Sequence, residues 1–92
     1  MVIIAGDLDM ASREHWFDAC VDAPGRQVVV ELSATTFMDC SGYSALTAAR
    51  RIIEGRGGTL TWQGANGEPA RLLTLLGSAH THVRRSNGAG VA

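Results

Sequence analysis

The chain has 92 residues and a mass of 9.7 kDa, which is the size of one small domain. Folding buries only about two-thirds of the unfolded surface at this length, which excludes a large enzyme and disfavours a deep catalytic cleft. The chain has eight basic residues, all Arg, and nine acidic residues. The resulting net charge of −1 disfavours binding to the phosphate backbone of nucleic acid. With 46% hydrophobic and 18% charged residues, we expect a folded chain.

The sequence also carries signals of its cellular compartment. Its two cysteines, Cys20 and Cys40, occur without a signal peptide, a combination typical of a reducing compartment. No stretch reaches the roughly 18 consecutive apolar residues that a membrane span needs. We therefore expect a cytoplasmic protein that does not insert into a membrane.

The first half of the chain predicts a strand, a helix and a second strand. Val2 to Ala5 is a short apolar run closed by Gly6 and Asp7, typical of a buried strand. A helix capped by Asp9 follows and ends at Ala23–Gly25. Its apolar stripe consists of Trp16, Phe17, Cys20 and Val21. The β-branched run Gln27–Leu32 predicts the central strand of a layered sheet.

The second half predicts a helix, a strand and a third helix. After a polar connector, Ser33 to Thr36, a helix begins at Asp39–Gly42 and ends near Glu54, before several glycines. The alternation of residues 59–63 predicts a strand. A leucine-rich helix opens at residues 66–69 and ends at Gly77, which we interpret as a C-cap. In residues 78–92 we expect one edge strand, Thr81 to Arg84, and a flexible tail.

The order and the motifs resemble a STAS domain, the fold of sulfate transporters and anti-sigma factor antagonists. The resemblance rests on three segments. These are Gly6-Asp7-Leu8-Asp9, the motif Phe37-Met38-Asp39-Cys40-Ser41-Gly42 between a Val-rich strand and a helix, and the leucines from Leu72 to Gly77. It implies a single α/β domain over 1–92, with its core in 2–77 and helices packed on a small central mixed β-sheet. The family usually adds a strand before Val2 and a closing helix after Gly77, and neither is predicted here.

The resemblance also implies a function. An anti-sigma factor antagonist binds an anti-sigma factor of the ATP-binding kinase type and so releases a sigma factor for transcription. It has no enzymatic turnover and no cofactor, and we expect a monomer or a weak homodimer. The contact surface that we expect is the loop and helix start from Thr36 to Tyr43, together with the turn at Gly6 to Asp9. Its partner-binding residues are Asp39, Cys40, Ser41, Gly42 and Tyr43, with Asp7 and Asp9.

In the family, the first hydroxyl residue after the Asp of the motif accepts phosphate from the kinase, and that position falls on Cys40. Three interpretations remain open. Ser41 takes the phosphate instead, Cys40 acts as a redox switch through its position at a helix N-terminus, or Cys40 is an unmodified small residue in a constitutively active protein.

Two other functions also remain open: a STAS subunit of a phospholipid-transport ABC complex, and a STAS module for oligomerisation. Other chemistry is disfavoured by spacing. Residues of zinc-ligand type occur at His15, Cys20, Cys40, His80 and His82. They form no Cys-x-x-Cys pair and no matched His pair, so we expect no metal site. Ser41 lies outside any Gly-x-Ser-x-Gly elbow, and Gly55–Gly58 lacks the Lys of a phosphate loop.

Overall fold

A computed structural model describes the backbone of residues 1–85 and the side chains of residues 1–77. Five strands and three helices follow one another along this part of the chain. They are β1 (Val2–Ile3), β2 (Gly6–Leu8), α1 (Arg13–Val21), β3 (Gln27–Glu31), β4 (Thr35–Met38), α2 (Cys40–Gly55), β5 (Thr59–Gln63) and α3 (Gly67–Arg85). The α/β class predicted from the sequence is confirmed.

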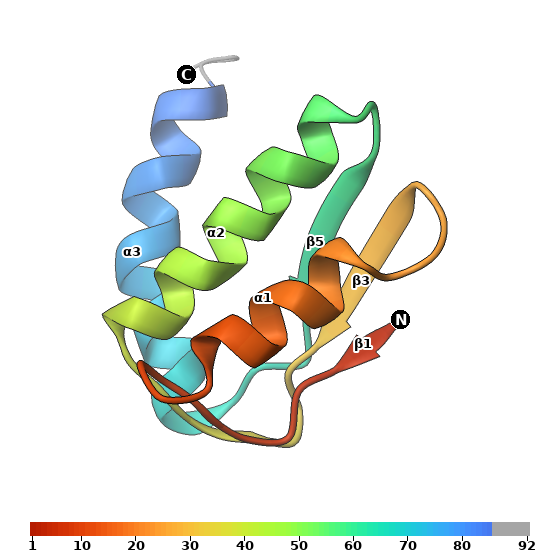
Figure 1. Ribbon diagram of the computed structural model, residues 1–92. Coiled ribbons are helices and arrows are strands. Elements are labelled where there is room, and N and C mark those ends of the chain that lie inside the picture. The colour runs from red at the N-terminus through yellow and green to blue at the C-terminus, as the bar shows by residue number, and fades with distance from the viewer. Residues whose placement is uncertain (86–92) are drawn as a thin grey trace.

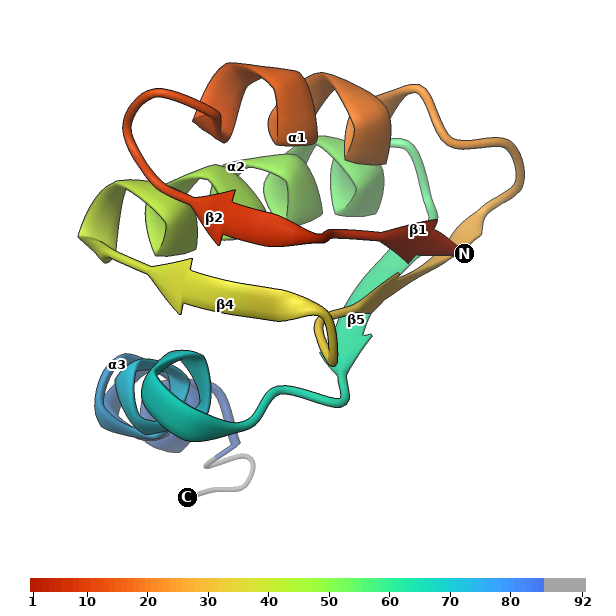
Figure 2. The same cartoon turned by 90° about the horizontal axis from the view of Figure 1, so that it is seen from below.

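The strands pair in parallel throughout the described residues. β3 lies at the centre of a three-stranded sheet between β1 and β5, and β2 pairs with β4 in a second sheet. The two pairings are continuous, because the N–H of Ile4 donates to Glu31 (3.1 Å) and the N–H of Gly6 to Ala34 (3.0 Å). Figure 2 shows β2 running on from β1, with β4 beside it. The structure thus has two parallel sheets in place of the one mixed sheet expected.

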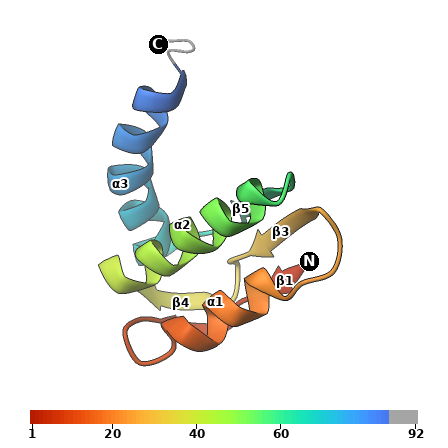
Figure 3. The same ribbon diagram turned by 45° about the horizontal axis from the view of Figure 1, so that its top comes forward.

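The helices cover the strands from two sides. α1 and α2 lie side by side over one face, and α3 packs against β4 from the other (Figures 1, 2 and 3). The core between these layers is aliphatic, and each fully buried side chain of this kind contributes about 1.5–3 kcal/mol. Its members include Ile4, Leu8, Cys20, Val28, Val30, Leu32, Met38, Leu46, Ala49, Ile53 and Leu60.

β2 and β4 were not predicted as strands. Gly6 and Asp7 were expected to close the first strand and residues 33–36 to form a polar connector, yet both segments are in strands and Thr35 is 2% exposed. Its hydroxyl donates to the carbonyl oxygen of Ile4 at 2.8 Å, which satisfies the polar group inside the core. Strands of three and four residues are too short for their alternation to be recognised in a sequence.

The start of α1 also differs from the prediction. Ser12 rather than Asp9 is the N-cap residue. The Asp9 carboxylate instead closes the preceding turn, where Oδ1 accepts from the N–H groups of Ala11 (3.0 Å) and Ser12 (3.1 Å). The helix therefore begins four residues after Asp9, at Arg13.

The edge strand predicted for Thr81 to Arg84 is wrong, because α3 continues as one helix from Gly67 to Arg85. Gly77 therefore lies inside the helix and does not end it. A glycine costs a helix interior only about 1 kcal/mol, and no proline follows to stop the helix. The expected tail, residues 86–92, lies outside the described residues.

Candidate functional site

The two carboxylates of the sequence motifs follow neighbouring strands. Asp9 comes directly after β2 and Asp39 directly after β4, and these strands run parallel in the register Leu8 to Met38. The N–H of Asp39 reaches the carbonyl oxygen of Leu8 at 3.4 Å. Carboxyl ends of parallel strands share one edge of a sheet, which is where α/β folds place their binding sites. The two segments therefore lie side by side at one edge of the sheet.

Asp39 fixes the first turn of α2. It is the N-cap residue, with an extended backbone, and its Oδ1 accepts from the N–H of Gly42 at 2.9 Å. This bond satisfies one of the N–H groups that a helix start leaves unpaired. Asp39 therefore acts on the surface by orienting the turn that carries Cys40 and Ser41.

Gly42 allows α2 to lie directly on β2. A Cβ atom at this position would overlap the carbonyl oxygen of Leu8 and lie 2.8 Å from its Cγ. Gly42 and Leu8 are both buried. The helix and the strand approach each other closely here because Gly42 has no side chain.

Cys40 and Ser41 form the exposed corner of the site. Cys40 is the first residue of α2 and is exposed, whereas Ser41 is half-buried. The unpaired N–H groups and the helix dipole contribute a partial positive charge to this corner, which the Asp39 carboxylate offsets. The other thiol, Cys20, is fully buried, and burial raises its pKa to about 11. Only Cys40 is therefore available to a partner or a reagent.

The remaining predicted site residues divide into exposed and structural ones. Asp7 is exposed and pairs in register with Phe37 of β4. The Asp9 side chain is turned onto its own loop, as described above. The Tyr43 ring lies edge-on to Trp62, with 6.1 Å between ring centroids, and its hydroxyl is buried without a hydrogen-bond partner among the described residues. Tyr43 thus packs inward while Asp7 lies on the surface.

Two exposed apolar side chains lie beside this corner. Phe37, which is 45% exposed, falls within the contact loop expected from Thr36 to Tyr43 but was not among its named residues, and Met10, which is 70% exposed in the loop after β2, was not predicted. A methionine that follows two acidic turn residues and precedes a helix is the signal that would have indicated it. We call the set Asp7, Met10, Phe37, Cys40 and Ser41 the α2-entry surface; all are exposed except the half-buried Ser41.

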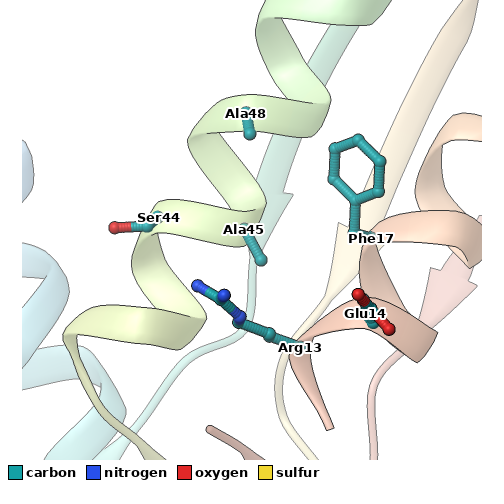
Figure 4. A pocket seen from close by; sticks show the side chains of 6 residues that line it. All are labelled: Arg13, Glu14, Phe17, Ser44, Ala45 and Ala48. Atoms are coloured by element: carbon teal, nitrogen blue, oxygen red, sulfur yellow. The ribbon is translucent and has the colours of Figure 1, made fainter. Parts of the chain in front are cut away.

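A groove of about 270 Å³ lies between α1 and α2 (Figure 4). It is lined by Arg13, Glu14, Phe17, Ser44, Ala45 and Ala48. In Figure 4 the side chains of Ala45 and Ala48 point toward α1, whereas that of Ser44 points away from it. The groove therefore follows the side of α2 that faces α1.

Among the residues that the structure describes, no three His, Cys, Asp or Glu side chains gather where they could hold a metal ion. His80 and His82 lie in α3, but their side chains are outside the described part. No helix within that part is both long and apolar enough to span a membrane.

Comparisons with known proteins agree with this geometry. The family model described as "Mlab, STAS domain" matches residues 1–85. No curated protein matches significantly. The chain is similar to a sulfate transporter family protein from Wolinella succinogenes, with a TM-score of 0.69 and 17% identity over 86% of this chain and 66% of that one. It thus spans just under two-thirds of that protein's length.

A second solved structure shares the fold. It is the unphosphorylated form of the anti-sigma factor antagonist SpoIIAA, with a TM-score of 0.60 and 17% identity over 90% of this chain and 86% of that one. At this identity the two structures establish the fold alone. With a family model that matches 85 of the 92 residues, the chain belongs to the STAS domain family.

Proposed function

We propose that this STAS domain is an anti-sigma factor antagonist that binds an ATPase-fold anti-sigma factor through the α2-entry surface. The observation that carries the proposal is the exposed first turn of α2, which Asp39 caps and Gly42 seats on β2. Such a turn presents a fixed set of backbone N–H groups to a partner. The anti-sigma factor antagonist SpoIIAA has the same fold.

The surface has the composition of a small docking site. Phe37 and Met10 supply apolar area, Asp7 supplies a charge at the rim, and Cys40 and Ser41 supply small side chains over which a partner backbone approaches closely. Interfaces of this kind have an apolar centre and a polar rim. The domain acts by binding, and we propose that it does so in the cytoplasm without turnover.

The chemistry at position 40 sets the form of regulation. Cys40 has no hydroxyl for a serine kinase, so phosphate control requires the half-buried Ser41. The Cys40→Ala and Ser41→Ala variants are incubated with the bound anti-sigma factor and ATP, and their masses are then measured. The masses show whether Ser41 accepts phosphate or the chain stays unmodified. Phosphate on Ser41 makes the protein a phosphoswitch. If the chain stays unmodified and peroxide does not change its binding, the protein is constitutively active.

The binding proposal is tested by affinity capture with three forms of the chain. Cys40→Glu places a negative charge on the entry surface, at a helix N-terminus where that charge does not harm the fold. Gln27→Glu adds the same negative charge at an exposed residue at the start of β3, and Glu has nearly the same shape as the Gln it replaces. We expect the wild type and Gln27→Glu to retain an ATPase-fold anti-sigma factor, identified by mass spectrometry, and Cys40→Glu to lose it. Equal retention by all three would refute the entry surface as the contact.

A second candidate is the STAS subunit of a phospholipid-transport ABC complex. Two observations favour it: the matching family model is the one described as "Mlab, STAS domain", and the family's acceptor position is occupied by Cys40. The same capture experiment decides, because an ABC ATPase in place of an anti-sigma factor would assign the chain to transport. If neither is retained and sizing shows concentration-dependent self-association, the chain is an oligomerisation module.

A further inference from the structure

We propose that the pocket between Arg26 and Arg56 binds a phosphoryl group. The pocket lies where the loop before β3 meets the turn after α2, and it has a volume of about 140 Å³. It is lined by Val21, Ala23, Gly25, Arg26, Val28, Ile53, Arg56 and Gly58. None of these residues belongs to the α2-entry surface, so the site is independent of the function proposed above.

The two arginines are directed to this place by separate contacts. The Arg56 guanidinium donates from Nη1 to the carbonyl oxygen of Val21 at 3.0 Å, at the C-terminal end of α1. The Arg26 guanidinium lies over the turn after α2, where a Cβ on Gly57 would be 2.9 Å from its Nη2. Gly57 has a φ of +87°, which favours glycine there and keeps the turn open to the arginine.

The charges of the pocket are not compensated within the described residues. Neither Arg26 nor Arg56 has a described carboxylate oxygen within 4.0 Å. The ion pair found among the described residues, between Arg71 and Glu68, lies on α3, away from this pocket. Both arginines are exposed and line one small space, so an anion placed there is attracted by two positive charges. Guanidinium groups bind phosphate with paired N–H donors, and Arg56 keeps four of its five donors beyond the bond to Val21.

The shape of the pocket limits the ligand. Pockets for drug-sized molecules begin at about 300 Å³, so this one holds a small group and not a whole nucleotide. Its floor is apolar, with Val21, Val28 and Ile53, and accommodates the first carbons attached to a phosphate. The ligand class is therefore a small phosphate ester or the phosphate of a lipid headgroup.

The test is a titration with glycerol 3-phosphate, followed by the backbone amide NMR signals. We expect saturable shifts confined to Gly25–Arg26 and Arg56–Gly58. Arg26→Gln and Arg56→Gln should each weaken binding at least tenfold, while Arg51→Gln, an exposed arginine of α2 outside the pocket, should leave it unchanged. Arg56→Lys, which keeps the charge, should bind between the wild type and Arg56→Gln, and thermal melting confirms that each variant is folded.

A second titration identifies the source of the phosphate. Vesicles of phosphatidylglycerol are compared with vesicles of phosphatidylcholine. Binding to the former that depends on Arg26 and Arg56 but not on Arg51, without a response to glycerol 3-phosphate, would assign the phosphoryl group to a lipid. The proposal is overturned if neither probe produces saturable shifts, or if Arg26→Gln with Arg56→Gln binds as well as the wild type.

Discussion

The contact between α2 and β2 makes Gly42 the most sensitive small residue of the site. In Gly42→Ala the new Cβ would overlap the Leu8 carbonyl oxygen, so helix and strand must separate. Neither moves freely, because Leu8 is fully buried and its strand is paired with β4. Overpacking of this kind costs about 1–3 kcal/mol. For a domain of this size the melting temperature should fall by roughly 5–20 °C.

The same helix provides the control. Gly55 is the last residue of α2, and a Cβ there meets nothing within 4 Å. Gly55→Ala should therefore be neutral or raise the free energy of unfolding by up to about 1 kcal/mol. Urea and thermal denaturation, followed by circular dichroism, measure both variants. If Gly42→Ala is as stable as Gly55→Ala, α2 is not seated on β2 as described.

Three further predictions concern the cap, the thiols and the third helix. Asp39→Ala should lower the free energy of unfolding by about 1 kcal/mol and Asp39→Asn by much less, since asparagine also caps helices; equal losses in urea denaturation would argue against the cap. In native protein one thiol, Cys40, should react with a disulfide reagent, because Cys20 is buried with a pKa raised to about 11, and two thiols reacting alike would contradict this burial. Gly77→Ala should stabilise the protein by about 1 kcal/mol if α3 runs through this position, whereas a loss of stability would place a helix end there.

The sequence predicts elements well where one physical signal dominates. The strand at residues 27–31 carries three consecutive valines, and α2 has a capping Asp, a regular apolar stripe and glycines at its end. The valine run places β3 in the buried core, and the apolar stripe of α2 indicates the face that packs on the sheet. β2 and β4 lack such a signal, because their burial depends on pairing with each other and on a hydrogen bond from Thr35 to a residue 31 positions away.

The end of α3 shows the opposite failure. A strong local signal, glycine after a leucine run, was interpreted as a helix end although its cost is small. For the site, the sequence predicted the motif residues and Asp7, since they come from recognisable turns, and its loop from Thr36 to Tyr43 contained Phe37 without naming it. It did not predict Met10 or the pocket of Arg26 and Arg56, because these depend on which loops the fold brings together.

The central claim, that a partner docks at the start of α2, is tested most directly by cross-linking from the entry surface. A benzophenone maleimide attached to Asp7→Cys, in a chain that also carries Cys40→Ala, sits at the rim of the entry surface, and Cys20 does not react because it is buried. In the control, Gln27→Cys with Cys40→Ala, the same group sits at the start of β3. The account predicts a light-dependent product with an ATPase-fold anti-sigma factor from position 7 and none from position 27. A product from position 27 alone, or none from position 7 when the partner is bound, would contradict it.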